Sequence, residues 1–114
     1  MNRRGKVVAI LRRVCRMGFI QVIEFRTSKV DEMREVGKEW ETAAGGDVKA
    51  RRRVLCTDRD NPGHYFNIVF FDTYESAMEN SQLPVTQEFS KRMMALGEGP
   101  PTFHNLDVVE DVEL

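Results

Sequence analysis

The chain has 114 residues, enough for one domain with a single hydrophobic core. Its composition, 41% hydrophobic and 31% charged, is that of a globular protein and excludes a disordered or fibrous class. The net charge of −1 hides an asymmetry: residues 1 to 16 carry six basic residues and no acid, whereas the rest carries eleven basic and eighteen acidic residues. We therefore expect a basic N-terminal extension, residues 1 to 16, followed by a single domain over residues 17 to 114.

The cysteine content and the apolar runs indicate the class of protein. Two cysteines, Cys15 and Cys56, are too few for a disulfide framework, and neither has a second cysteine at metal-ligand spacing. No apolar run approaches the length of a membrane span. We therefore expect a cytoplasmic protein with no metal and no membrane span. Apolar residues between Val7 and Cys15 recur at helical spacing, which leaves open contact with an anionic surface, although a dispensable appendage is the simpler interpretation and no nucleic acid is expected.

The first half of the domain reads as a strand, a helix and a hairpin. Residues 19 to 26, FIQVIEFR, are rich in β-branched residues and predict a strand. Ser28 and Asp31 predict the start of a helix with one apolar stripe, which Gly45 and Gly46 end. Two further strands are expected at about Val48 to Asp58 and about His64 to Asp72. In the sequence DNPG between them, Pro62 and Gly63 suit the central positions of a type II turn.

The second half adds a second helical unit and a last strand. Asp72 and Glu75 predict the start of a short helix, YESAMENS, and Pro84 the start of a further helical segment. The sequence GEGPP ends that segment, and TFHNLDVVEDV predicts the last strand. The order β-α-β-β-α-β is that of an α+β, ferredoxin-like fold with a four-stranded antiparallel sheet. Because the helices of such a fold cover one face of the sheet, the other face needs a partner.

The third strand is apolar on both faces. Tyr65, Val69 and Phe71 alternate with Phe66, Ile68 and Phe70, so each face of the strand is apolar. The simplest cover for the second face is the same face of another copy, which predicts an isologous homodimer joined through its sheet faces. Asn67 interrupts this apolar run. A buried amide must be hydrogen-bonded, either across the sheet or the dimer seam or to a ligand.

These elements, with the doubly apolar third strand and the run FFDTYESAMENSQLPVTQEF, resemble the dimeric α/β barrel superfamily, in particular its antibiotic biosynthesis monooxygenase branch. The resemblance covers roughly residues 18 to 110. It implies two sheets facing each other in a homodimer and a small-molecule pocket between sheet and helices in each subunit. Members include cofactor-free oxygenases acting on polycyclic phenols, haem-degrading enzymes and proteins with no known reaction.

The departures from the family pattern narrow the chemistry. Where many oxygenase-like members have a histidine in the short helix after the third strand, this sequence has Asn80 and Ser81. Haem degradation is disfavoured because the only tryptophan, Trp40, is expected on the first helix and both histidines, His64 and His104, on strands. No cofactor is therefore expected.

The candidate site residues each have a structural alternative. We expect Trp40, Tyr65, Asn67 and Asn80 to contact a ligand, although Trp40 and Tyr65 also suit core packing. His104, in the last strand beside Asn105 and Asp107, is the candidate general base. His64 follows the turn and is expected to be solvated.

The sequence supports two classes of function. The first is a protein that binds a small apolar or aromatic molecule beneath its helices, with cofactor-independent oxygenase chemistry as its enzymatic form. The second is a structural or regulatory homodimer whose pocket is filled by its own side chains. A cavity of a few hundred Å³ lined by the candidate residues would favour the first class.

Overall fold

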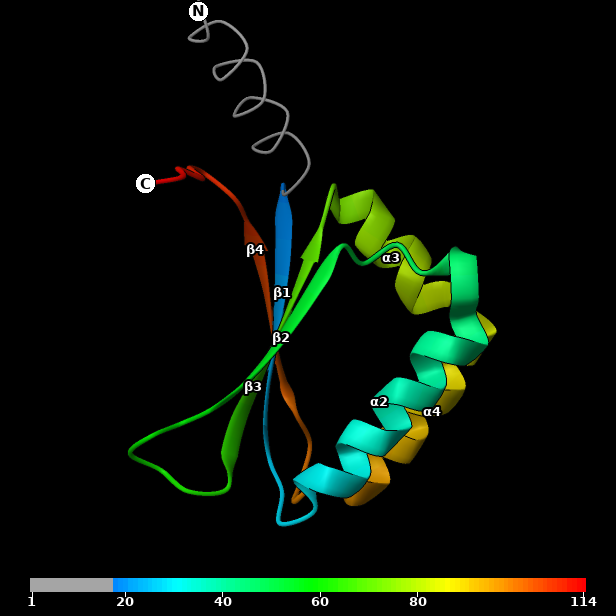
Figure 1. Cartoon of the computed structure of the whole chain (residues 1–114), viewed down its shortest axis with the longest axis vertical. Helices are drawn as coiled ribbons and strands as arrows, with labels where there is room; N and C mark the ends of the chain where they lie inside the picture. The colour runs from blue at the N-terminus through cyan, green and yellow to red at the C-terminus, as the bar shows by residue number, and fades with distance from the viewer. Residues whose placement is uncertain (1–17) are drawn as a thin grey trace, which may run out of the picture.

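A computed structural model describes residues 18 to 114 as one four-stranded antiparallel sheet with three α-helices on one of its faces (Figure 1). The elements, in chain order, are β1 (Phe19–Arg26), α2 (Val30–Ala44), a 3-10 turn η1 (Gly45–Asp47), β2 (Arg52–Thr57), β3 (His64–Phe71), α3 (Tyr74–Gln82), α4 (Pro84–Leu96) and β4 (Thr102–Asp107). The predicted α+β, ferredoxin-like fold is confirmed, with the second helical unit divided into α3 and α4. The predicted extension, residues 1 to 16, lies outside the described residues.

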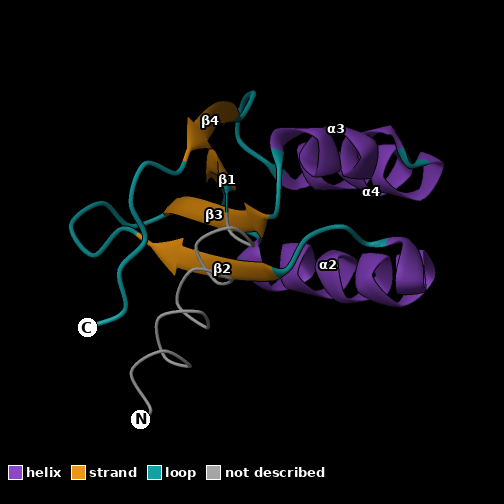
Figure 2. Ribbon diagram, turned by 90° about the horizontal axis from the view of Figure 1, so that it is seen from above, coloured by secondary structure: helices purple, strands orange, loops and turns teal. Residues whose placement is uncertain are grey.

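The strands lie in the order β2-β3-β1-β4, so the first and third strands of the chain form the centre of the sheet. Phe19 is opposite Phe71 in β3, and Ile23 is opposite Asn67. All three strand pairings are antiparallel. Because side chains alternate along a strand, the register divides the sheet into a helix-facing side and an open side that no described helix covers (Figure 2).

The core lies at one end of the sheet, between the strands and α3. Phe19, Val69, Phe71 and Ala77 form a buried cluster, and the Phe19 and Phe71 rings are 6.4 Å apart. On α2 the apolar stripe buries Met33 and Val36, and this helix packs beside α4. The periodicity read from the sequence therefore identifies the buried face of this helix.

The hairpin turn has the predicted chemistry. Gly63 has φ 86°, a conformation in which a side chain would be strained, and Asn61 accepts a hydrogen bond from the backbone N–H of His64 at 3.2 Å. Pro62 occupies the position before Gly63, where its fixed φ suits a type II turn. This turn sets the register of β2 on β3.

Both predicted helix caps, Ser28 and Asp72, are wrong by one residue. At α2, Lys29 is the cap position and no side chain caps the helix. Thr27, which is buried, accepts from the Lys29 N–H at 2.9 Å and donates to the carbonyl of Leu96 at 2.7 Å. This threonine therefore takes over the turn that Ser28 was expected to make.

At α3 the cap is Thr73, whose Oγ1 accepts from the Ser76 N–H at 3.0 Å. The predicted cap, Asp72, instead binds Arg51 at 2.8 Å. The Asp72 carboxylate forms a charge-assisted hydrogen bond with the guanidinium of Arg51. The hydroxyl of the neighbouring Thr73 therefore caps the helix instead.

The second and last strands are shorter than predicted. The second strand begins at Arg52 instead of Val48, because the segment before it bonds to α3: the Lys49 N–H donates to Asn80 Oδ1 at 3.0 Å. The last strand ends at Asp107, after which the Val108 N–H bonds to the carbonyl of Gly18. Before the second strand, the bond to Asn80 thus takes the place of a ladder bond that the sequence pattern had implied.

The open side of the sheet is apolar and half-exposed in the single chain. It carries alternate residues of the four strands: Ile20, Val22, Val54, Phe66, Ile68, Phe70 and Leu106. On β3 only Val69 and Phe71, both on the helix-facing side, are buried. Burial of both faces, as the sequence predicted, would need a partner on the open side.

Candidate functional site

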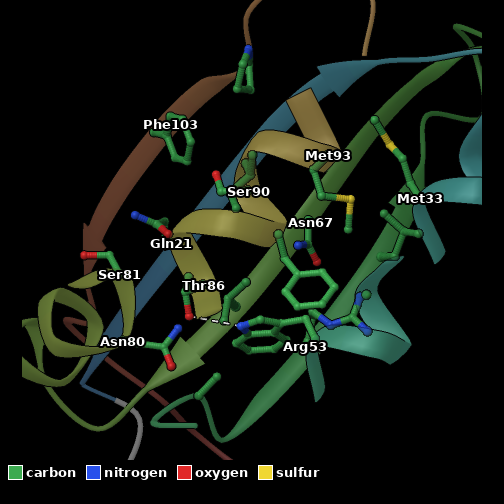
Figure 3. A pocket seen from close by; sticks show the side chains of 18 of the residues that line it. Gln21, Met33, Arg53, Asn67, Asn80, Ser81, Thr86, Ser90, Met93 and Phe103 are labelled. Carbon is green, nitrogen blue, oxygen red and sulfur yellow. Dashed lines mark hydrogen bonds between the residues drawn. The ribbon is translucent and has the colours of Figure 1, made fainter. Parts of the chain in front are cut away.

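A cavity of about 750 Å³ lies between the helix-facing side of the sheet and the helices (Figure 3). Ile23, Leu55 and Val69 from the strands, and Trp40 and Phe89 from the helices, are among its apolar walls. This volume is in the range of small-molecule sites, and a mostly apolar wall with a few polar groups is typical of them. The predicted cavity is therefore present, on the predicted side of the sheet.

Asn67 lies on the sheet wall of this cavity, in the middle of β3. Its cross-strand neighbours are Ile23 and Leu55, and Val69 follows on the same face. The Asn67 Oδ1 atom is buried and accepts no hydrogen bond from the described residues. Such an acceptor costs about 1–3 kcal/mol, so its presence here needs an explanation.

Trp40 reaches the cavity from α2 and is held there by α4. Its indole Nε1–H donates to Thr86 Oγ1 at 3.0 Å, the bond drawn as a dashed line in Figure 3. The donor of the indole is thus used within the protein, and the ring is left as an apolar wall. Trp40 therefore joins two helices and lines the cavity, and its predicted contact with a ligand stays a prediction.

Asn80 lies at the α3 end of the cavity and is buried. Its Oδ1 accepts from the backbone N–H of Lys49, so this amide fixes the segment that leads into β2. Asn80 thereby shapes the cavity wall. Its predicted contact with a ligand stays a prediction.

Two predicted site residues do not line this cavity. Tyr65 is near the hairpin end of β3, where its ring stacks on Phe25 with centroids 5.7 Å apart. His104 is opposite Val22 and on the open side of the sheet, where its Nε2 lies 3.0 Å from Glu24 Oε1. The structure therefore brings together Trp40, Asn67 and Asn80 and leaves Tyr65 and His104 elsewhere; the predicted role of His104 as a general base stays a prediction.

Two arginines of the cavity wall, Arg51 and Arg53, are paired with carboxylates. Arg53 Nη2 lies 2.5 Å from Glu41 Oε1, and the guanidinium packs against Gly37 of α2, where a Cβ would come within 3.5 Å of it. Arg51 donates to Asp72 from both Nε and Nη2, and this hydrogen bond raises the pKa of Arg51. Arg51 and Arg53 thus have carboxylate partners within the chain, whereas Arg52 lies over the ring of Phe70.

Several cavity residues were not identified from the sequence. They are mainly polar or sulfur-containing side chains of α4 and single residues of β1 and β4, namely Gln21, Thr86, Ser90, Met93 and Phe103. Gln21 is two residues from Ile23, so strand alternation places it on the same face and was a usable signal. Thr86 and Ser90, polar residues of α4, had no such signal, because the rotation of a helix with a mixed surface depends on its packing.

The chain resembles solved structures closely in fold and weakly in sequence. SnoaB, a cofactor-independent oxygenase from Streptomyces nogalater, was solved as a variant that superposes with a TM-score of 0.70 at 14% identity, over 82% of this chain and 95% of that one. A protein from Caulobacter crescentus, provisionally assigned as an antibiotic biosynthesis monooxygenase, gives 0.68 at 15% identity over 88% and 98%. A similarly assigned protein from Bordetella bronchiseptica gives 0.64 at 20% identity over 82% and 99%.

The chain has the fold of the antibiotic biosynthesis monooxygenase-like proteins. No protein-family model and no curated protein sequence matches the chain. At these identities the similarity concerns the fold alone, so reaction and ligand must be argued from the cavity. Between residues 18 and 114, no helix has both the length and the apolar character needed to cross a membrane.

Proposed function

We propose that the protein binds an apolar aromatic small molecule in the cavity and that a hydroxyl group of this ligand donates a hydrogen bond to Asn67 Oδ1. The observation that supports this is the buried acceptor without a partner among the described residues. The sequence left open a hydrogen bond across the sheet, but no described residue donates one to Asn67 Oδ1. A bond across a dimer seam is disfavoured because Asn67 faces the helices and the open side faces away.

The walls of the cavity support a ring system as the ligand. Trp40, Phe89 and Phe103 offer aromatic surface, and Phe103 is 53% exposed at the β4 edge. A flat ligand can stack on such surfaces while its hydroxyl reaches the amide. The alternative is a dimer whose pocket is filled by its own side chains. It is disfavoured because the side chains leave a cavity of about 750 Å³ open.

As an enzyme, the protein would use cofactor-independent oxygenation, the activity named for SnoaB. In its simplest stoichiometry, O2 converts a ring methylene beside a phenol into a carbonyl: one oxygen atom enters the product, and the other leaves as water with the two hydrogens. The substrate itself supplies the electrons. Consumption of O2 by the purified protein with 1,8-dihydroxyanthrone, without added cofactor, tests this form of the proposal.

The binding proposal can be tested with two matched probes. 1-Naphthol carries a hydroxyl donor, and 1-methoxynaphthalene is similar in shape without it. In fluorescence titrations we expect 1-naphthol to bind about fivefold to tenfold more tightly, as one hydrogen bond to a buried acceptor predicts. Equal affinities would contradict the role of Asn67, and absence of binding by either probe would contradict the cavity as the site.

A cavity-filling variant locates the binding. Ser90, on the cavity side of α4, is replaced in Ser90→Trp, and Thr42, exposed on α2 outside the cavity, in the control Thr42→Trp. We expect the first variant to weaken both probes and the second to leave both unchanged. Equal effects of the two variants would place the probes elsewhere.

The open side of the sheet supports a homodimer as the assembly. Its apolar residues are half-exposed in one chain, and an interface of this kind buries on the order of 2,000 Å² or more in total. Sedimentation velocity at micromolar concentration should give a dimer. Ile68→Glu, in the centre of this face, should give a folded monomer, whereas Lys38→Glu on the exposed side of α2 should not. A monomeric wild-type chain would refute the dimer.

A further inference from the structure

The wall of the cavity is rich in cations, although the domain that surrounds it is acidic. Residues 18 to 114 hold eleven basic and eighteen acidic residues. Among these, the charged residues that line the cavity are Arg34, Arg51, Arg52, Arg53 and Lys91 and a single acid, Glu41. Cations are thus concentrated at the site, and carboxylates are nearly absent from it.

Four of these five cations have partners within the described chain. The three that have a carboxylate in reach are, each with its partner, Arg34 with Asp31, Arg51 with Asp72, and Arg53 with Glu41. The guanidinium of Arg52 lies over the ring of Phe70, which is on the open side of the sheet. The charge of these four arginines is therefore either balanced by a carboxylate or directed away from the cavity.

Lys91 is the exception. It lines the cavity from α4, and no carboxylate between residues 18 and 114 forms an ion pair with it. Successive residues of an α-helix are rotated by about 100°, so Lys91 lies at the flank of the helix face on which Ser90 meets the cavity. The residue is exposed. Its ammonium group can therefore lie at the rim of the cavity and remain hydrated when no ligand is bound.

The cavity opens on the side of Lys91, between α4 and β4. Phe103 of β4 is 53% exposed and Ser90 of α4 is also exposed, and both line the cavity. Figure 3 shows their side chains on the same side of the site. At the other edge of the sheet the ion pair between Arg53 and Glu41 joins β2 to α2. A ligand that enters between α4 and β4 therefore meets a cation without a partner.

We propose that the ligand of the cavity is an aromatic hydroxy acid, whose carboxylate pairs with Lys91 while its hydroxyl donates to Asn67. This inference rests on the proposed function and adds a second polar contact to it. Asn67 is on the sheet and Lys91 on a helix, so the two polar groups belong at opposite ends of the ring system. One ammonium group without a partner balances one negative charge, which fits a carboxylate better than a doubly charged phosphate.

The distribution of charge over the domain favours such a ligand. A cleft lined by one sign of charge attracts ligands of the opposite sign. Glu41 is the one acidic residue among the described residues of the lining, and it is paired with Arg53, so the wall repels an anion little. Because Lys91 is exposed, pairing with it stabilises a complex only modestly and is weakened by salt.

Two probes of the same shape test the charge. 6-Hydroxy-2-naphthoate carries its hydroxyl and its carboxylate at opposite ends, and 6-hydroxy-2-naphthamide has a neutral amide in place of the carboxylate. In fluorescence titrations of the full-length protein at about pH 7, where a carboxylate is ionised, we expect the naphthoate to bind about threefold to fivefold more tightly. Raising the NaCl concentration from about 0.05 M to about 0.5 M should remove most of this difference. Equal affinities at the lower salt concentration would overturn the proposal.

Variants of α4 assign the difference to one side chain. Lys91→Gln should bind the two probes equally, whereas Lys91→Arg should keep the preference for the naphthoate. Arg92→Gln is the matched control, because Arg92 follows in the same helix, pairs with Glu39 and does not line the cavity. It should keep the preference as well. A preference that persists in Lys91→Gln, or that is lost equally in Arg92→Gln, would overturn the contact with Lys91.

The same titrations separate this inference from the proposed function. If both probes bind equally and Ser90→Trp weakens both, the cavity remains the binding site and only the pairing with Lys91 is refuted. If neither probe binds, both proposals are refuted. A preference for the naphthoate that depends on Lys91 and is weakened by Ser90→Trp supports the two together.

Discussion

Replacing Asn67 by leucine tests separately how the amide affects the stability of the fold and how it affects ligand binding. The amide lies among Ile23, Leu55 and Val69, and its buried Oδ1 has no partner in the described chain. An unsatisfied acceptor of this kind costs about 1–3 kcal/mol, and leucine, of similar size, removes it while adding apolar contact. One kcal/mol corresponds to roughly 4 °C or more in a domain of about 100 residues. We therefore expect Asn67→Leu to melt about 4 °C or more above the wild type.

The assay is a pair of measurements on each variant: a thermal melt followed by circular dichroism and a titration with 1-naphthol. Asn67→Leu should gain stability and lose about fivefold or more in affinity for 1-naphthol. Asn67→Asp is the matched control, because it keeps the size of the side chain and adds a buried charge, so it should melt well below the wild type. A marked drop in the melting temperature of Asn67→Leu with unchanged affinity would refute the reasoning, since it would show that a protein group depends on the amide.

Three further predictions concern the rest of the chain. Thr86→Val leaves the indole N–H of Trp40 without its acceptor and should destabilise the protein by about 1 kcal/mol or more in urea unfolding. Thr86→Ser keeps the hydroxyl and should not. Equal stability of the two variants would contradict the hydrogen bond between α2 and α4. Glu24 has a lowered pKa, so its contribution to stability is present above the ordinary glutamate range and is lost as the pH falls through the lowered value. Melts from about pH 6 to about pH 3 should therefore show less acid sensitivity in Glu24→Gln than in the wild type. Deleting residues 1 to 16 should leave the melting temperature unchanged, and a substantial loss would show that the extension is part of the fold.

The order of the elements could be predicted because each has its own local signal. The apolar stripe of α2, the Pro62 and Gly63 turn and the double apolar pattern of β3 depend on residues close together in the chain, and all three are present in the structure. The caps and the start of β2 depend on contacts over longer separations. Asp72 forms an ion pair with Arg51, and the Lys49 N–H donates to Asn80 Oδ1. Neither pairing has a signature in the local sequence.

In the candidate site, too, some residue positions could be predicted from local sequence and others depend on long-range contacts, here the pairing register of the strands. Asn67 could be assigned to a face because Val69 and Phe71, two and four residues further along the strand, lie on the same face. The last strand, TFHNLD, has no clear alternation, so the sequence did not fix which face His104 would occupy. In the structure His104 is opposite Val22, on the open side, and Phe103 faces the cavity instead. A shift of β4 by one residue would exchange the two faces. Only the pairing of β4 with β1, between residues some eighty positions apart in the chain, therefore puts a histidine beside Glu24 and a phenylalanine in the wall of the cavity.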